Sequence, residues 1–190
     1  IPMAGLGSRF AVAGYKLPKP LISVAGTPMV RLVIENIRPE TPHRFIFICQ
    51  KEHVQTYGID RLLQGWAPGS VIIEIDKLTE GAACTVLLSK DYIDSDQPLM
   101  IANSDQFVEV DINAYLLDLE RRHLDGLIMT MPESDPKWSY VRLNAEQLVV
   151  ETAEKKAISN HATVGIYNFA RGRDFVQAAE RMIREQVRVN

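Results

Sequence analysis

A cationic, glycine-rich stretch near the start of the chain is where residue types and spacing first point to chemistry. It reads Ala4-Gly5-Leu6-Gly7-Ser8-Arg9, and residues 1–34 contain no Asp or Glu. Glycines at positions 5 and 7 let the backbone turn sharply and approach a phosphate, because no Cβ stands in the way. Exposed N–H groups and the planar guanidinium of Arg9 can then bind phosphate oxygens. Taken alone, the loop fits a tight turn without a ligand equally well.

A second cationic group follows at Lys19, which stands between Pro18 and Pro20. Each proline fixes its own φ and biases the preceding residue toward extended conformations, so we expect Lys19 to lie on a stiff stretch. Two common phosphate-binding loops are excluded. Phe10 stands where a dinucleotide fingerprint needs glycine, and the GKS or GKT sequence of a Walker loop does not occur.

The elements that must position these residues alternate along the chain. Apolar runs typical of buried strands occur at Arg44–Cys49, Val71–Ile75, Pro98–Ala102 and Leu127–Met131. Helical spacing of apolar residues occurs around them, over Pro28–Ile37, His53–Leu63, Gly81–Tyr92 and Ile112–His123. This alternation predicts an α/β fold with right-handed crossovers and a mainly parallel sheet that is covered by helices.

After Pro132 the pattern changes to short strands without long helices between them. These strands are expected at Tyr140–Leu143, Leu148–Glu151 and Thr163–Phe169, with a closing helix over Asp174–Gln186. They predict a small antiparallel addition to the sheet. Without repeats or a linker, residues 1–190 are expected to form a single domain. Both ends look cut, since Ile1-Pro2-Met3 would be only the tail of a first strand.

Composition excludes several classes of protein. The formal net charge is −3, although residues 1–34 carry four basic side chains and no acidic one. A mildly acidic chain with one cationic block favours a small anionic ligand over nucleic acid. No apolar run is long enough for a membrane helix, and no signal peptide is apparent. The two cysteines, Cys49 and Cys84, lie in apolar segments, which argues against a disulfide framework and favours a cytoplasmic location.

Together these motifs resemble the start of the nucleotidyltransferase superfamily, the sugar-phosphate pyrophosphorylases. The resemblance is carried by Ala4–Phe10, Pro18–Leu21 and Gly26–Met29, and it continues at later points over nearly the whole chain. It implies a Rossmann-like, three-layer fold of the GT-A type with a mixed, mainly parallel central sheet. It also implies an enzyme that transfers NMP from an NTP to a sugar 1-phosphate or similar small phosphate, with Mg²⁺ as cofactor and pyrophosphate as product.

The resemblance also implies which residues would contact the nucleotide. The loop residues Ala4, Gly5, Leu6, Gly7, Ser8 and Arg9 would hold the triphosphate. Glu80, Gly81 and Ala82 would lie against the base and ribose, although helix capping around Thr79 is the simpler alternative there. Asn103 and Asp105 end a buried strand, and Asp105 would bind Mg²⁺ beside the triphosphate oxygens. A turn with self-bonding side chains is the alternative for that segment.

On the acceptor side, the resemblance implies Glu154 as a partner of substrate hydroxyls. Lys19 and Lys155 would hold the acceptor phosphate, while Asn160 would border the acceptor site. A solvated charge run remains the alternative for residues 154–156. Tyr140 stands where many relatives carry glycine, so we expect it to narrow or re-line the acceptor pocket. The second metal-binding Asp of the family has no counterpart that can be assigned in the sequence.

The implied mechanism needs no general base, because the acceptor phosphate is already an anion near neutral pH. Arg9, Lys19 and Asp105 would work by positioning the two substrates and cancelling their charge. The four histidines lack ligand spacing, and no GxSxG nucleophile motif occurs. Three alternatives stay open: a cytidylyltransferase for phosphocholine or a phosphonate, a nucleotide-sugar-dependent glycosyltransferase, and a catalytically silent nucleotide-binding regulator. A homo-oligomer is compatible with the chain.

Overall fold

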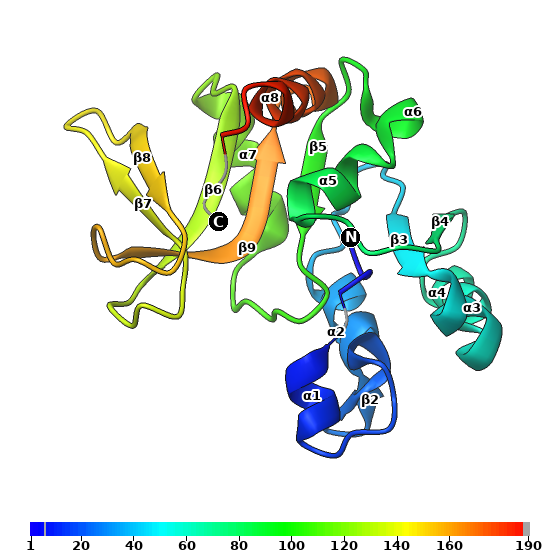
Figure 1. Cartoon of the computed structure of the whole chain (residues 1–190). Coiled ribbons are helices and arrows are strands. Elements are labelled where there is room, and N and C mark those ends of the chain that lie inside the picture. Colours follow the sequence, from blue (N-terminus) through cyan, green and yellow to red (C-terminus); the bar gives the residue numbers. More distant parts are fainter. Residues whose placement is uncertain (6, 188–190) are drawn as a thin grey trace.

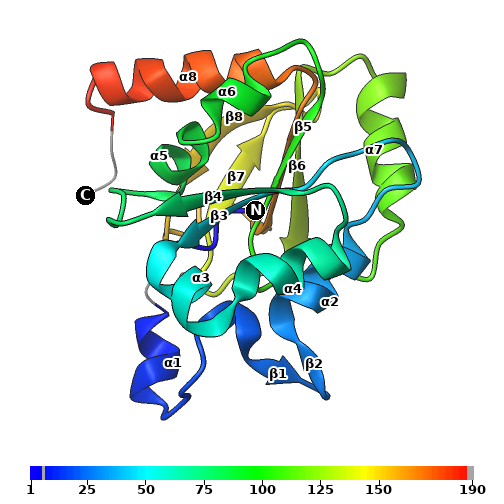
Figure 2. The same ribbon diagram turned by 90° about the vertical axis from the view of Figure 1, so that its right-hand side faces the viewer.

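The computed structural model describes residues 1–5 and 7–187. The chain is an α/β protein in which helices cover strands that gather into two larger sheets (Figures 1 and 2). Every strand that the sequence predicts is present, with its ends shifted by at most two residues. The α/β class is therefore confirmed.

The N-terminal part forms a small group of elements at one end of the molecule (Figure 1). It contains helix α1 (Ser8–Val12), a 3₁₀ turn η1 (Lys19–Leu21), the hairpin β1 (Ser23–Val24) and β2 (Thr27–Pro28), and helix α2 (Met29–Asn36). The sequence pattern missed α1 and the hairpin because α1 has only five residues and each hairpin strand only two, too few for a repeating pattern of apolar residues. Val30, Val33 and Ile34 bury one face of α2 in the core.

A parallel pair of strands forms the first sheet. Strand β3 (Ile46–Gln50) pairs with β4 (Val71–Ile75), and helices α3 (Lys51–Tyr57) and α4 (Ile59–Trp66) connect them. The sequence predicted one helix over His53–Leu63. The structure divides it at Gly58, whose φ of 60° is the left-handed conformation that ends a helix.

The second sheet contains strands β5 (Leu99–Ala102), β6 (Gly126–Pro132), β7 (Tyr140–Leu143), β8 (Val149–Ala153) and β9 (His161–Phe169). All of its pairings are antiparallel, so the expectation of a mainly parallel sheet is wrong for this part. The reason is β9, which runs antiparallel to both β5 and β6 and pairs with each of them. The alternation of strands and helices along the sequence does not show that β9 inserts between β5 and β6 in the sheet.

Helices cover these strands on both sides. Helices α5 (Ala82–Leu87) and α6 (Lys90–Ile93) replace the single helix expected over Gly81–Tyr92, while α7 (Ile112–Arg121) and α8 (Gly172–Arg184) are close to their predicted bounds. Helix α7 begins at Asp111, whose carboxylate accepts hydrogen bonds from the N–H groups of Asn113 and Ala114. Helix α8 packs Phe175 and Val176 against Val86 and Ile93.

Candidate active site

The glycine loop and Lys19 pack directly against each other. Gly7 has a φ of 59°, and a Cβ placed there would lie 3.2 Å from Lys19 Cβ. A larger residue would therefore be strained and would press on the lysine. Leu6, which the resemblance assigned to the nucleotide site, lies outside the described residues. Ala4 is buried, and its carbonyl oxygen accepts a hydrogen bond of 2.7 Å from Gln50 Nε2, which ties the loop to the end of β3.

Lys19 and Asp105, far apart in sequence, form an ion pair. Lys19 Nζ lies 2.5 Å from Asp105 Oδ2, and the two side chains are 27% and 36% exposed. The pair is thus accessible to a ligand without being fully solvated. Lys19 Nζ also lies 5.9 Å from the centre of the Phe10 ring. This arrangement joins the glycine loop to the end of β5.

Lys19 is held by its neighbours, although in a conformation that differs from the expectation. It begins the turn η1, in which the Leu21 N–H donates to the carbonyl of Pro18 and the Ile22 N–H to that of Lys19. The preference for an extended residue before Pro20 is overridden, because Pro20 and Leu21 are buried. The backbone beneath Lys19 is nevertheless fixed.

Asp105 follows β5 at a point where the backbone is anchored on β9. The Asn103 N–H donates to the carbonyl of Gly165 at 3.0 Å. In the amide orientation that satisfies its hydrogen bonds, Gln106 Nε2 donates to the carbonyls of Val164 and Gly165. Gly165 has a φ of 82°, and a Cβ there would overlap the side chains of Asn103 and Gln106. Only glycine fits this close approach without displacing both neighbours.

The sheet forks beside Gly165. Strand β6 pairs along one edge of β9, so β5 and β7 share the other edge. The Asn103 N–H bonds to Gly165 and the Ser139 carbonyl to the Thr163 N–H, which places the two bonds two residues, or about 7 Å, apart along β9. Between them β5 and β7 separate, and the segment carrying Asp105 leaves the sheet. The fork therefore brings the end of β5 close to the beginning of β7.

Arg9 and Ser8 are exposed on α1, next to this arrangement. Within the described part of the chain, Arg9 makes no ion pair, whereas Lys19 already has one. Gly5 is also exposed, and a Cβ there would meet no atom within 4 Å. The open surroundings of Gly5 and Arg9 leave room for an anionic ligand.

The segment expected to contact the nucleobase follows β4. Glu80, Gly81 and Ala82 are exposed there, and the surroundings of Gly81 are open. Thr79 does not cap helix α5: its hydroxyl donates to the carbonyl of Gly81 and shares a hydrogen bond with the Thr85 hydroxyl. The capping alternative for Thr79 is thus wrong, and the role of the segment in base binding stays a prediction.

Tyr140, which was expected at the acceptor site, lies in the core. Its side chain is fully buried, and its hydroxyl donates to the carbonyl of Asp135 at 2.7 Å. Burial raises the pKa of Tyr140, so the hydroxyl remains a donor. The expectation that Tyr140 re-lines the acceptor pocket is therefore wrong, because it has no exposed surface with which to contact an acceptor.

The other acceptor-side residues lie on the β8–β9 connection. Lys155 Nζ lies 3.3 Å from Glu154 Oε1, and both side chains are well exposed. Asn160 is exposed, and its carbonyl accepts a hydrogen bond from the Glu133 N–H. Because Tyr140 pairs with both Ala153 and Ala162, the residues after β8 begin beside the same end of β7 that meets the fork.

The donor set around Asp105 fits a magnesium ion. In residues 1–5 and 7–187, no group of three or more His, Cys, Asp or Glu side chains could enclose a metal. Mg²⁺ usually binds through one or two carboxylates, substrate phosphates and water. A single, partly exposed carboxylate beside the glycine loop, whose surroundings are open, matches that chemistry.

Sequence reasoning missed Gly165, Gln106 and Gln50 as residues that hold the site together. Gly165 offered a detectable signal, since an isolated glycine inside an apolar strand indicates a close backbone approach. Gln50 and Gln106 offered none, because each acts on a distant backbone carbonyl.

Comparison with known proteins identifies the family of this chain. The sequence profile described as "Nucleotidyl transferase" matches residues 1–188. The chain belongs to the nucleotidyl transferase family. It is also 27% identical over 174 residues to the bifunctional protein GlmU of Methanocaldococcus jannaschii, and 25% identical over 175 residues to that of Methanococcus vannielii. These matches cover 87% and 86% of the chain and 38% of each relative, so the chain spans about two fifths of their length.

Solved structures agree with this nucleotidyl transferase assignment. A nucleoside-diphosphate-sugar pyrophosphorylase from Vibrio cholerae RC9 is 27% identical, with a TM-score of 0.75 over 100% of this chain and 78% of that one. A UDP-glucose pyrophosphorylase in complex with UDP-glucose has a TM-score of 0.74 over 94% and 77% of the two chains. Because it is only 14% identical, it supports the fold alone. Among the described residues, no helix of this family member is long and apolar enough to cross a membrane.

Proposed function

We propose that the chain carries the active site of an enzyme that transfers NMP from an NTP to a sugar 1-phosphate, with release of pyrophosphate. The observation that carries this proposal is the contact of Lys19 with both Gly7 and Asp105. It joins a phosphate-binding loop, a cation and a carboxylate in one place. Membership of the nucleotidyl transferase family and the similarity to sugar-nucleotide pyrophosphorylases support it.

The reaction is an in-line displacement at the α-phosphorus. An oxygen of the acceptor phosphate forms a bond to that phosphorus, and the bond to the oxygen that bridges to the β-phosphorus breaks. The electron pair leaves with pyrophosphate, so no proton has to be removed from the nucleophile. The glycine loop, Lys19 and Asp105 include no histidine, which is consistent with such chemistry.

The residues of the chain would overcome the repulsion between the two anionic substrates. The N–H groups of the glycine loop and the guanidinium of Arg9 would bind the triphosphate. Lys19 would neutralise the attacking phosphate, because its ammonium already stands beside the carboxylate of Asp105. When Mg²⁺ is bound, Asp105 would hold it and the ion would reduce the charge of the triphosphate. Gly165 and Gln106 would act only by positioning the segment that carries Asp105.

The acceptor would lie on the other side of the fork. Glu154 would accept hydrogen bonds from its hydroxyl groups, and Lys155 would bind its phosphate. Since Tyr140 is buried, it gives no reason to exclude a hexose 1-phosphate. A sugar phosphate is therefore the acceptor class that we propose, ahead of phosphocholine or a phosphonate.

A panel assay tests the proposal. The complete protein is incubated with each of the common NTPs, Mg²⁺ and a set of sugar 1-phosphates, phosphocholine and phosphonates, and pyrophosphate is measured. We expect pyrophosphate to form with one NTP and to require a sugar 1-phosphate. Turnover with phosphocholine or a phosphonate alone would overturn the acceptor class. Release of nucleoside diphosphate from a nucleotide sugar would identify a glycosyltransferase, and NTP binding without turnover would identify a regulator.

A further inference from the structure

The segment that carries Asp105 has no regular structure of its own. Residues 103–111, which the structure describes throughout, connect β5 to α7 without a helix or strand. Their first part is held on β9 at Gly165, and Asp111 caps α7 at the other end. Backbone groups between these two ends need partners wherever they are shielded from water. The partners of the middle of the segment therefore help to decide where Asp105 lies.

Asn36 supplies both partners at the middle of this segment. Its Nδ2 donates to the carbonyl of Val108 at 2.8 Å, and its Oδ1 accepts from the Val108 N–H at 2.9 Å. The amide thus pairs with Val108 as the backbone of a neighbouring strand would. Both residues are half-buried, although 72 positions separate them in the sequence. An aliphatic side chain or an ionised carboxylate at position 36 could not donate and accept at once.

Helix α2 links this contact to Lys19. Asn36 is the last residue of α2. One face of the helix packs in the same core cluster as Leu21, which belongs to the turn η1 that begins at Lys19. A neighbouring face packs in a second cluster, against which Val108 lies. One short helix therefore supports the turn that carries Lys19 and, through Asn36, the segment that carries Asp105.

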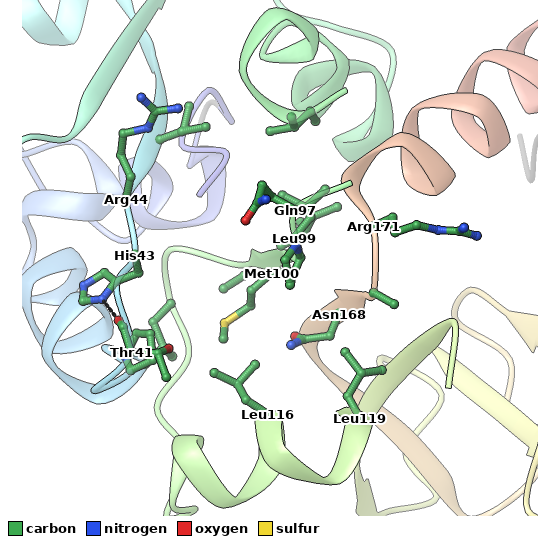
Figure 3. A pocket seen from close by; sticks show the side chains of 18 of the residues that line it. Thr41, His43, Arg44, Gln97, Leu99, Met100, Leu116, Leu119, Asn168 and Arg171 are labelled. Carbon is green, nitrogen blue, oxygen red and sulfur yellow. Dashed lines mark hydrogen bonds between the residues drawn. The ribbon is translucent and has the colours of Figure 1, made fainter. Parts of the chain in front are cut away.

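The chain on the other side of this contact lines a cavity. The cavity has a volume of about 1240 Å³, and Thr41, which follows α2, and Leu116 of α7 are among its lining residues (Figure 3). The lining that the structure describes includes neither member of the Lys19–Asp105 pair. There, Asn113 Oδ1 accepts a hydrogen bond of 2.8 Å from the Glu40 N–H. A second asparagine thus joins the same two parts of the chain without belonging to the candidate active site.

We propose that Asn36 is a positioning residue for the Lys19–Asp105 pair. Its amide holds the segment of Asp105 against the helix that supports Lys19, and in this way sets the separation of carboxylate and ammonium. Val108 is only three residues from Asp105, so a displacement of Val108 reaches the carboxylate. A shift of about 1 Å at a reacting group can cost about 100-fold in rate. This role rests on the proposed function of the pair, and Asn36 acts through Val108 rather than on a substrate.

The kinetic test compares Asn36→Ala with Asn113→Ala, the matched control. Asn36→Ala should lower kcat about tenfold and raise the Mg²⁺ concentration for half-maximal activity about tenfold, the scale for loss of a residue that orients a metal ligand. KM for the sugar 1-phosphate should change less than about twofold, because the acceptor side is untouched. Asn113→Ala should leave all three constants within about twofold, since its hydrogen bond lies at the cavity. Equal changes in both variants would reduce Asn36 to a general structural role and overturn the proposal.

A binding measurement separates this proposal from the proposed function. The probes are Mn²⁺ and inorganic tripolyphosphate, and the electron paramagnetic resonance signal of free Mn²⁺ reports how much metal is bound. With tripolyphosphate present, Asn36→Ala should weaken Mn²⁺ binding about tenfold, whereas Asn113→Ala should not. Unchanged binding in Asn36→Ala would overturn the positioning role even if the unaltered chain turns over NTP. If the unaltered chain forms no pyrophosphate, the proposed function fails while the Mn²⁺ comparison still decides the role of Asn36. Absence of Mn²⁺ binding by the unaltered chain would overturn both.

Asn36→Gln takes the place of Asn36→Ala if the alanine variant does not fold. Glutamine keeps the donor and the acceptor on a stem that is one methylene longer, so it can pair with Val108 only by displacing it. Mn²⁺ binding should therefore weaken in the same direction while Tm stays close to that of the unaltered chain. A folded Asn36→Gln variant that binds Mn²⁺ as tightly as the unaltered chain would contradict the proposal.

Discussion

The two sides of the fork differ in how firmly they are held. On the side of the glycine loop, the loop, Lys19 and Asp105 are fixed by buried neighbours and by backbone bonds to β3 and β9. On the acceptor side, Glu154 and Lys155 are exposed at the end of an edge hairpin and contact each other. The difference indicates that the groups proposed to cancel charge are held in place by the fold, whereas residues on the proposed acceptor side can change without disturbing the core. Loss of catalysis and loss of acceptor affinity should therefore separate.

The largest effect is expected at Asp105. Asp105→Asn removes the carboxylate while keeping the shape of the side chain, and kcat/KM should fall at least about 100-fold, the scale for one major transition-state contact. Glu109→Gln is the matched control, because Glu109 is an exposed acid in the same segment; it should change kcat/KM less than twofold by the same reasoning. A fall in kcat/KM of less than about tenfold for Asp105→Asn would contradict a role of this carboxylate in the reaction.

Arg9 is expected to follow with an effect of about 100-fold. Arg9→Ala deletes the guanidinium that we propose binds the triphosphate, so steady-state kinetics should show a lower kcat/KM for NTP. Lys16→Ala, a change of another exposed cation in the same segment, serves as control and should have little effect. Equal losses for the two variants would mean that the segment acts only through its overall charge.

On the acceptor side, Lys155→Ala should raise KM for the sugar 1-phosphate about tenfold, as for loss of one charge-assisted contact. KM for NTP should stay unchanged. The neighbouring Lys156→Ala tests whether position or mere charge matters, since both lysines are exposed. If Lys155→Ala lowered kcat as strongly as Arg9→Ala, the separation between the two sides would fail.

The smallest effect on activity is expected at Tyr140. Tyr140→Phe deletes the hydrogen bond to the carbonyl of Asp135, which should lower the free energy of unfolding by about 1 kcal/mol. Denaturant unfolding measures that loss, and KM for the acceptor should not change. An increase in the acceptor KM without a loss of stability would show that the Tyr140 hydroxyl contributes to the acceptor site.

The sequence predicted most elements of the fold and the types of residue at the site, but not their connections. Apolar runs located the strands correctly, because a short continuous apolar run is typical of a buried strand. The strand predicted at Val71–Ile75, for example, has the same bounds in the structure. The insertion of β9 between β5 and β6 left no mark, because periodicity is the same for parallel and antiparallel neighbours. The break at Gly58 had a local signal, a glycine inside a helical pattern.

Contacts between distant segments could not be predicted from residue types. Lys19 and Asp105 were each expected at a phosphate site, yet nothing in the spacing places one within 2.5 Å of the other. Tyr140 was expected in the acceptor pocket because it stands where many relatives carry glycine, whereas the fold buries its side chain and pairs its hydroxyl with the Asp135 carbonyl. Tertiary packing decided both cases, by bringing Lys19 against Asp105 and by burying Tyr140.

A double-mutant cycle of Lys19→Ala and Asp105→Ala tests the central claim most directly, with kcat/KM for NTP measured at saturating acceptor. Residues that contact each other and act on the two reacting partners of one displacement should couple, so the double variant should lose no more than about tenfold beyond the more damaging single change. Single losses that simply multiply in the double variant would show two independent sites and would contradict the account.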